Sequence, residues 1–157
     1  MIGRPVSALL LLFFLTSGVM AAFADEPVLT IVTADGEKLY DRAALEALPQ
    51  SRIRTHTSVT DGLQQFTGPL MRDLLADAGF QSAEVRALAL NDYEVVIPLK
   101  DFERFDVIAA LSMNGHDLTP RDKGPVWIVY PRDDDAVLQD IRYDYRWVWQ
   151  LTRLEAP

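Results

Sequence analysis

The feature that most constrains this chain is one short amphipathic helix predicted within residues 66–80. Five apolar side chains recur at three- and four-residue spacing and form one broad stripe: Leu70, Met71, Leu74, Leu75 and Ala78. Most of the sequence that follows is typical of short strands. We therefore expect this helix to cover the open face of a β-sheet.

The ends of this helix are also indicated by the sequence. Pro69 suits a first helical turn, where its missing N–H would be unpaired anyway, and Thr67 or Gly68 can supply the cap. Gly79 can adopt the left-handed conformation that ends a helix, with Phe80 folding back onto the last turn.

The other predicted elements are short strands and brief helices. Strands are expected at 28–33, 52–60, 84–90, 93–97, 106–113, 117–119, 126–130 and 148–153. Helices are expected at 42–48, capped by Asp41, and at 101–105. Asn114-Gly115 is the strongest hairpin signal, and Asn91-Asp92 predicts a second two-residue hairpin. The pattern predicts the α+β class, as a single β-rich mixed domain with short helices.

The first 24 residues have the character of a signal peptide. Arg4 precedes an apolar stretch at 8–15, and Ala22-Phe23-Ala24 offers small residues to a signal peptidase. We expect cleavage after Ala24, which leaves residues 25–157 as the domain in the periplasm. The alternative is an uncleaved membrane anchor, which no second basic flank supports.

Charge and cysteine content narrow the possible functions. Cleavage would leave 133 residues and move the formal charge from −8 to −9, because Arg4 is removed. No clustered Lys or Arg is available to neutralise phosphates, so neither nucleic acid nor an anionic membrane surface is an expected partner. The sequence contains no cysteine, so stability must come from the apolar core rather than from disulfides.

Four segments of the chain together resemble the oxidoreductase molybdopterin-binding domain of the sulfite oxidase type. The segments are 66–75, 113–118, 124–131 and 150–155. The resemblance implies a mixed α+β fold. In catalytic members, it also implies a pterin-bound molybdenum held through one protein cysteine thiolate.

The departures from that family concern the cofactor. The resemblance places the metal-ligating cysteine on the strand 54–59, where this chain has His56 or Thr57 near that position. A hydroxyl cannot replace a soft thiolate and an imidazole would alter the metal, so we expect sulfite oxidase chemistry to be lost. The basic segment that helps to hold the pterin phosphate is replaced by Arg146-Trp147-Val148-Trp149, and two indoles suit that role poorly.

The leader at residues 1–24 also argues against a bound cofactor. The resemblance implies that cofactor-loaded members are usually exported folded behind a twin-arginine signal, whereas this leader carries only Arg4. An unfolded chain could not carry the cofactor across the membrane.

Two regions are candidate binding sites. Arg54, His56 and Ser58 would share one strand face, as an anion-binding or pterin-like pocket or as a solvated face. The aromatic segment 143–149, with Arg132 and Arg142 nearby, would contribute half of its side chains to the core and the rest to a groove for a small ligand or a partner protein.

The remaining polar residues carry weaker signals. His116 follows a turn and is expected to be a turn residue rather than a ligand, and two distant histidines are a poor case for zinc. Asp133-Asp134-Asp135 lacks the alternate spacing of a calcium loop and is expected to be a solvated loop. Ser58 and Ser112 lack any nucleophile motif.

The sequence therefore predicts a cofactor-free periplasmic module that binds a small ligand or a signalling or redox partner. The alternative is a molybdopterin-dependent oxidoreductase, or a subunit of one, that uses His56, Thr57 or no protein ligand. Whether the chain is an enzyme stays open, and no catalytic or metal-binding residue is assigned. The candidate ligand-binding residues are Arg54, His56, Thr57, Arg132, Arg146 and Trp147.

Overall fold

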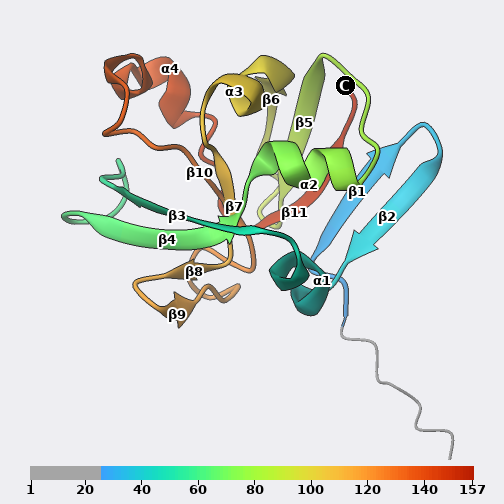
Figure 1. Ribbon diagram of the computed structural model, residues 1–157, viewed down its shortest axis with the longest axis horizontal. Helices are drawn as coiled ribbons and strands as arrows, with labels where there is room; N and C mark the ends of the chain where they lie inside the picture. The colour runs from blue at the N-terminus through green and yellow to red at the C-terminus, as the bar shows by residue number, and fades with distance from the viewer. Residues whose placement is uncertain (1–25) are drawn as a thin grey trace, which may run out of the picture.

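Three β-sheets form the frame of the protein in a computed structural model that describes residues 26–157 (Figure 1). The strands are β1 Leu29–Thr33, β2 Gly36–Tyr40, β3 Gln50–Thr55, β4 Gln64–Pro69, β5 Glu84–Ala89, β6 Glu94–Pro98, β7 Ile108–Ala110, β8 Ser112–Met113, β9 His116–Asp117, β10 Trp127–Val129 and β11 Leu151–Glu155. The helices are α1 Arg42–Ala47, α2 Met71–Asp77, α3 Leu99–Arg104 and α4 Ile141–Asp144, with a 3-10 turn η1 at Ala136–Gln139. The predicted α+β class with short helices is confirmed.

The signal peptide predicted at residues 1–24 lies outside the described residues. Within residues 26–157, no helix is both long enough and apolar enough to span a membrane.

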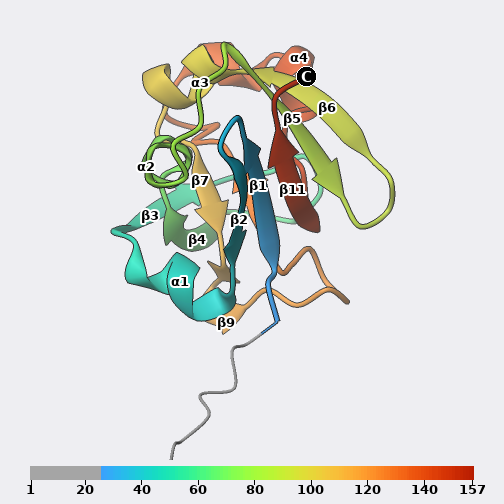
Figure 2. The same ribbon diagram turned by 90° about the vertical axis from the view of Figure 1, so that its right-hand side faces the viewer.

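The largest sheet has five strands in the order β2-β1-β11-β5-β6. The last strand, β11, pairs in parallel with β1 and antiparallel with β5, so the final residues of the sheet lie in its middle (Figure 2). A four-stranded sheet, β3-β4-β8-β9, and a two-stranded sheet, β10-β7, complete the frame.

The helix α2 buries the apolar stripe expected from the sequence, with Met71, Leu74 and Leu75 inside the core. Its C-terminus is as predicted: Gly79 has φ +72°, and the Phe80 N–H donates to the Leu75 carbonyl at 2.9 Å.

The N-terminus of α2 was predicted wrongly. Thr67, Gly68 and Pro69 belong to β4, and the cap position is Leu70, whose side chain makes no capping hydrogen bond. The Met71 N–H instead donates to the Val107 carbonyl at 2.8 Å. A tertiary contact thus replaces the local cap that the sequence suggested.

The strand β4 crosses β7 at very short range, at Gly68. A Cβ added at Gly68 would lie 2.0 Å from the Ala109 carbonyl oxygen, so no larger residue fits this crossing.

The stretch 106–113 was predicted as one strand, but it divides between two sheets. β7 pairs with β10, and β8 pairs with β4. The residue between them, Leu111, donates its N–H to the Thr67 carbonyl at 2.8 Å. The apolar run at 107–111 indicates a buried extended segment but does not say which neighbour it pairs with.

The two hairpin predictions had different outcomes. Asn114 and Gly115 both have positive φ, 53° and 80°, and form the expected two-residue turn between β8 and β9. At the other hairpin, the Ala89 N–H donates to the Tyr93 carbonyl at 2.9 Å, which leaves a three-residue loop rather than two residues. Asp92, at φ 61°, takes the left-handed position of that loop.

Two further strand boundaries and one helix differ from expectation. The strand predicted at 52–60 ends at Thr55, and the last strand begins at Leu151 rather than at residue 148. The short helix α4 was not predicted. The cap of α1 is confirmed, since the Asp41 side chain accepts from the Ala44 N–H at 2.7 Å.

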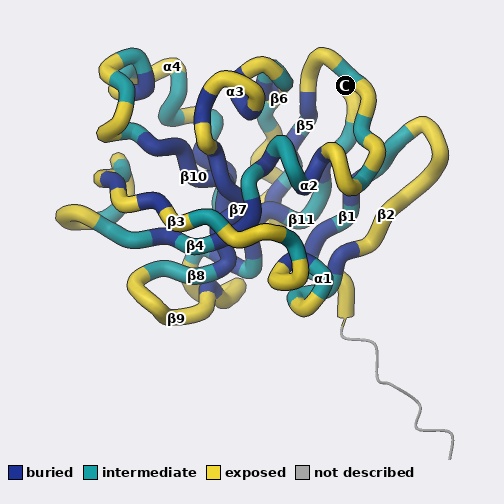
Figure 3. Tube along the Cα trace, viewed as in Figure 1, coloured by how far each residue is buried: buried dark blue, intermediate teal, exposed yellow. Residues whose placement is uncertain are grey.

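The core is continuous between the sheets, and β7 and β10 are buried along their whole length (Figure 3). Trp127 on β10 is fully buried and packs edge-to-face against Phe66 on β4, with ring centroids 5.2 Å apart. Trp127 also contacts the rings of Trp147 and Trp149, which lie in the segment between α4 and β11.

Candidate functional site

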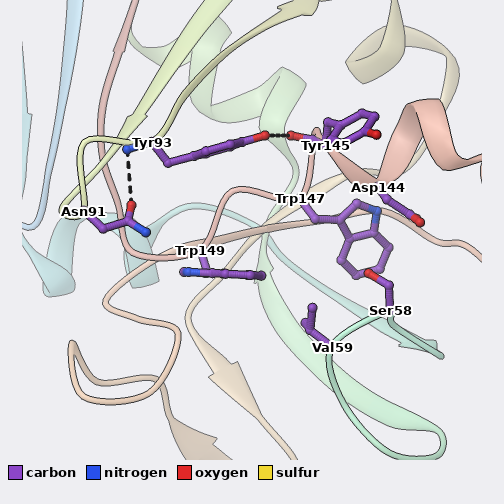
Figure 4. A pocket seen from close by; sticks show the side chains of 8 residues that line it. All are labelled: Ser58, Val59, Asn91, Tyr93, Asp144, Tyr145, Trp147 and Trp149. Atoms are coloured by element: carbon purple, nitrogen blue, oxygen red, sulfur yellow. Dashed lines mark hydrogen bonds between the residues drawn. The ribbon is translucent and has the colours of Figure 1, made fainter.

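A pocket of about 220 Å³ lies where three connecting segments meet. They are the loop after β3, the β5–β6 turn and the segment from the end of α4 towards β11. The lining residues are Ser58, Val59, Asn91, Tyr93, Asp144, Tyr145, Trp147 and Trp149 (Figure 4).

Aromatic rings form most of the pocket wall. Figure 4 shows the rings of Tyr93 and Trp149 edge-on, one above the other, with the Trp147 indole to one side of the space between them. Tyr93 is fixed because its hydroxyl donates to the Tyr145 carbonyl at 2.7 Å. Burial and the neighbouring Tyr145 raise the pKa of Tyr93, so its hydroxyl stays protonated at neutral pH.

The core supports these rings from behind. Trp147 is 5% exposed; its ring stacks on Tyr130 at a centroid distance of 6.2 Å and meets Trp127 edge-on, also at 6.2 Å. Trp149 meets Trp127 at 6.4 Å. The pocket wall is therefore part of a packed aromatic cluster rather than a set of loose surface side chains.

One buried donor in this wall lacks a partner. The indole Nε1 of Trp147 makes no hydrogen bond within residues 26–157. Figure 4 shows this nitrogen on the side of the ring that faces Asp144. A buried indole N–H without an acceptor is unfavourable.

Two of the three arginines predicted to bind a ligand are engaged by carboxylates. Arg132 pairs with Asp144, and Arg146 pairs with the buried Asp101. The Arg146 guanidinium also lies 4.6 Å from the centroid of Tyr143. Among residues 26–157, no Lys or Arg lines the pocket, and its one charged lining residue is Asp144.

Asp101 is also bonded to the core. It is 4% exposed and accepts a hydrogen bond from the Tyr130 hydroxyl at 3.0 Å. Burial, followed by the charge of Asp101, raises the pKa of Tyr130 well above its ordinary value. Tyr130 thus remains a hydrogen-bond donor and fixes the ring on which Trp147 stacks.

His56 lies at the edge of the site and pairs with Asp133. Its Nδ1 lies 2.7 Å from the Asp133 carboxylate, and its backbone N–H donates to the same oxygen at 3.0 Å. Burial raises the pKa of the Asp133 carboxyl, but the His56 side-chain and backbone hydrogen bonds outweigh this and lower it. The pair fastens the loop after β3 to the loop after β10.

The predicted polar face of Arg54, His56 and Ser58 does not form, because β3 ends at Thr55. Arg54 is exposed, His56 faces Asp133, and Ser58 reaches the pocket. The hydroxyl of Thr57 lies 2.7 Å from that of Thr60 and shapes the loop.

Of the six candidate binding residues, Trp147 lines the pocket directly and Arg132 reaches it through Asp144. Tyr145 and Trp149 of the predicted aromatic groove also line it. The sequence did not single out Val59, Asn91 and Tyr93. The turn at residues 91–92 was recognisable, but its proximity to residues 145–149 depends on the order of strands in the sheet.

The acidic run 133–135 does not converge on one point. Asp133 is held by His56, whereas Asp135 caps η1 by accepting from the Val137 N–H at 3.0 Å. His116 is exposed on β9. Across the described part of the chain, no group of three His, Cys, Asp or Glu residues could hold a metal ion.

Comparison with known proteins agrees with this architecture. The solved structure of the sulfane dehydrogenase SoxCD from Paracoccus pantotrophus is similar, with a TM-score of 0.61 and 17% identity. The match covers 81% of this chain but 37% of the other, so this chain spans well under half the length of that protein. At this identity the likeness concerns the fold alone. No curated protein sequence matches the chain.

Residues 41–133 match the family described as the oxidoreductase molybdopterin binding domain, and this match spans more than half of the chain. It includes β3, β4, α2 and both smaller sheets. The family resemblance seen in the sequence is thereby confirmed, and the chain belongs to the oxidoreductase molybdopterin binding domain family.

Proposed function

We propose that this protein is a periplasmic binding module of its family that carries no molybdenum and holds a small organic ligand in the aromatic pocket. In this role it would serve as an accessory domain for a signalling or redox partner. One observation carries the proposal. The two segments where the family resemblance expects the cofactor, 54–59 and 146–149, both reach the pocket but contribute mainly aromatic and aliphatic side chains there.

The donor set does not fit a thiolate-held metal. The sequence has no cysteine, and the nearest imidazole, His56, turns its Nδ1 to Asp133. Molybdenum in this family takes a soft thiolate, for which Thr57 or Ser58 is no substitute.

The charges do not fit a pterin phosphate either. Phosphate sites use Arg, Lys or backbone N–H groups at short range. Here Arg132 and Arg146 are neutralised by Asp144 and Asp101, and within residues 26–157 the one charged lining residue is a carboxylate. Within residues 26–157, the lining offers no unpaired basic side chain to an entering anion.

Family membership favours one alternative, a molybdopterin-dependent oxidoreductase or a subunit of one. In that case His56, Thr57 or no protein group would hold the metal. His56→Ala would then abolish metal retention, whereas unchanged metal content in this variant would exclude His56 as the ligand.

The test is elemental analysis for molybdenum and tungsten with a pterin fluorescence assay. The protein would be taken from the periplasm of its own host, grown under conditions in which a known molybdoenzyme is loaded. We expect neither metal nor pterin, and stoichiometric amounts of both would overturn the proposal.

Ligand binding is tested separately by thermal unfolding in the presence of a chemically diverse set of small molecules. A ligand specific for the folded state stabilises it by RT ln(1 + [L]/Kd). The variant Trp149→Leu should lose this stabilisation, and Leu39→Ser, at an exposed position on β2, should retain it. Equal stabilisation of both variants would place the ligand elsewhere.

A further inference from the structure

We propose that the ligand of the aromatic pocket is an organic cation with an alkylated ammonium group. This inference rests on the proposed function, namely that the pocket binds a small molecule, and it specifies the chemical class.

The pocket wall has the composition that recognises such cations. Four aromatic residues line a space of about 220 Å³: Tyr93, Tyr145, Trp147 and Trp149. The negative face of an aromatic ring attracts a cation, most strongly for Trp, and the attraction grows when the cation is desolvated. Alkylated ammonium groups are favoured because they lose less hydration energy than a free ammonium on entering an apolar space.

The polar groups at the pocket favour the same charge. Asp144 contributes a carboxylate to the lining, where it also pairs with Arg132, and the Tyr145 carbonyl is an acceptor held in place by the Tyr93 hydroxyl. No basic lining residue of the described part of the chain opposes a cation. The whole chain carries a formal charge of −8, which attracts cations from solution.

Neighbouring rings already bind cations of the chain itself. Lys123, which does not line the pocket, places its Nζ 5.6 Å from the centroid of Trp127 and 6.0 Å from that of Trp149. The Arg146 guanidinium likewise lies over the Tyr143 ring, 4.6 Å from its centroid. Inside the pocket, the ring of Tyr93 has no such partner among the described residues.

The experiment compares two probes of the same shape that differ in charge: choline and its neutral carbon analogue 3,3-dimethylbutan-1-ol. Binding to the full chain is followed by calorimetry and by tryptophan fluorescence. We expect choline to bind at least about tenfold more tightly, which corresponds to about 1.4 kcal/mol. Equal affinities, or a preference for the neutral alcohol, would overturn the inference, and so would the failure of both probes to bind.

Variants of the lining residues test whether choline binds in this pocket. Trp149→Leu and Tyr93→Leu should each weaken choline binding at least about fivefold, and Tyr93→Phe, which keeps the ring, should weaken it less. Asp144→Asn should also weaken it, whereas Asp77→Asn, a matched change at the exposed Lys38–Asp77 pair, should leave it unchanged. Equal weakening by Asp144→Asn and Asp77→Asn would show only a general charge effect and would contradict the inference.

The failure of this inference is distinguishable from failure of the proposed function. If neither probe binds but another compound stabilises the protein and requires Trp149, the binding function stands and only the ligand class is wrong. If the purified protein contains molybdenum and pterin, the proposed function itself fails.

Discussion

The guanidinium of Arg146 bonds the carboxylate of Asp101, and this pair connects the segment after α4 to the buried end of α3. Removing one member of a buried pair leaves an uncompensated charge inside the protein. We therefore expect Arg146→Met to lower the free energy of unfolding by about 3 kcal/mol.

The control for this prediction is Arg142→Ala, which breaks the exposed Arg142–Asp140 pair and should lower the free energy of unfolding far less, because solvent screens that pair. Urea denaturation of both variants measures the difference. The double variant Arg146→Met/Asp101→Leu should recover much of the loss, since it removes the unpaired charge. Equal destabilisation by the two single variants would contradict this account.

Gly68→Ala should be among the most damaging small substitutions in the chain. The added Cβ would approach the Ala109 carbonyl oxygen to 2.0 Å, so β4 and β7 would have to separate. We expect a loss of about 3 kcal/mol or more, at the upper end of overpacking costs. Gly62→Ala, where the Cβ meets no atom but φ is +70°, should cost only about 1–2 kcal/mol. Thermal unfolding of the two variants checks the order.

Asp77 should contribute to acid sensitivity. The hydrogen bond from Lys38, followed by that from Tyr40, lowers the pKa of Asp77 in the folded state. A lowered pKa stabilises the fold at pH values above the unfolded pKa of about 4, and this stabilisation fades as the pH falls further. Asp77→Asn should thus be less stable than wild type at pH 7 and approach it at pH 2. A constant difference between pH 7 and pH 2 in urea titrations would refute the prediction.

Asp133 should control the mobility of one pocket wall. Its carboxylate bonds the Nδ1 of His56 and accepts a hydrogen bond from the backbone N–H of the same residue. Ser58 and Val59, two and three residues further along the chain, line the pocket. In Asp133→Ala, we expect faster hydrogen exchange across residues 56–63 and little change in β5 or β11. Unchanged exchange in 56–63 would show that Thr57 and Thr60 hold the loop without this pair.

Lys123, which does not line the pocket, tests how a nearby positive charge affects the binding of a cation there. Its ammonium lies 6.0 Å from the Trp149 ring and should repel a second cation on that residue. Lys123→Gln should therefore raise the affinity for choline by about twofold, the size expected for a screened like charge at this range. Reduced affinity would indicate that Lys123 matters mainly by positioning Trp149.

Local signals in the sequence predicted those elements whose cause is local. Asp41, Gly79 and the Asn114-Gly115 turn act within a few residues of themselves, and each prediction from them is confirmed. The family resemblance, which depends on several such segments in order, is also confirmed.

The failures share a different cause. Pro69 was assigned to a helix because nothing nearby in the sequence reveals that β4 pairs with β3 and β8. Likewise, Tyr93 and Trp149 come from segments more than fifty residues apart, and they share a pocket only because β5 lies next to β11. The aromatic half of the site could be recognised in 143–149, but its partners depend on the topology of the sheet.

The place of β11 has a consequence for how this domain is made. Because β11 inserts between β1 and β5, the five-stranded sheet has a gap until residues 151–155 are available. Since translation runs from the N-terminus, β1 and β5 are made before β11, and a nascent chain that ends before residue 151 cannot form the continuous sheet. The main sheet should therefore close only after residues 151–155 have left the ribosome.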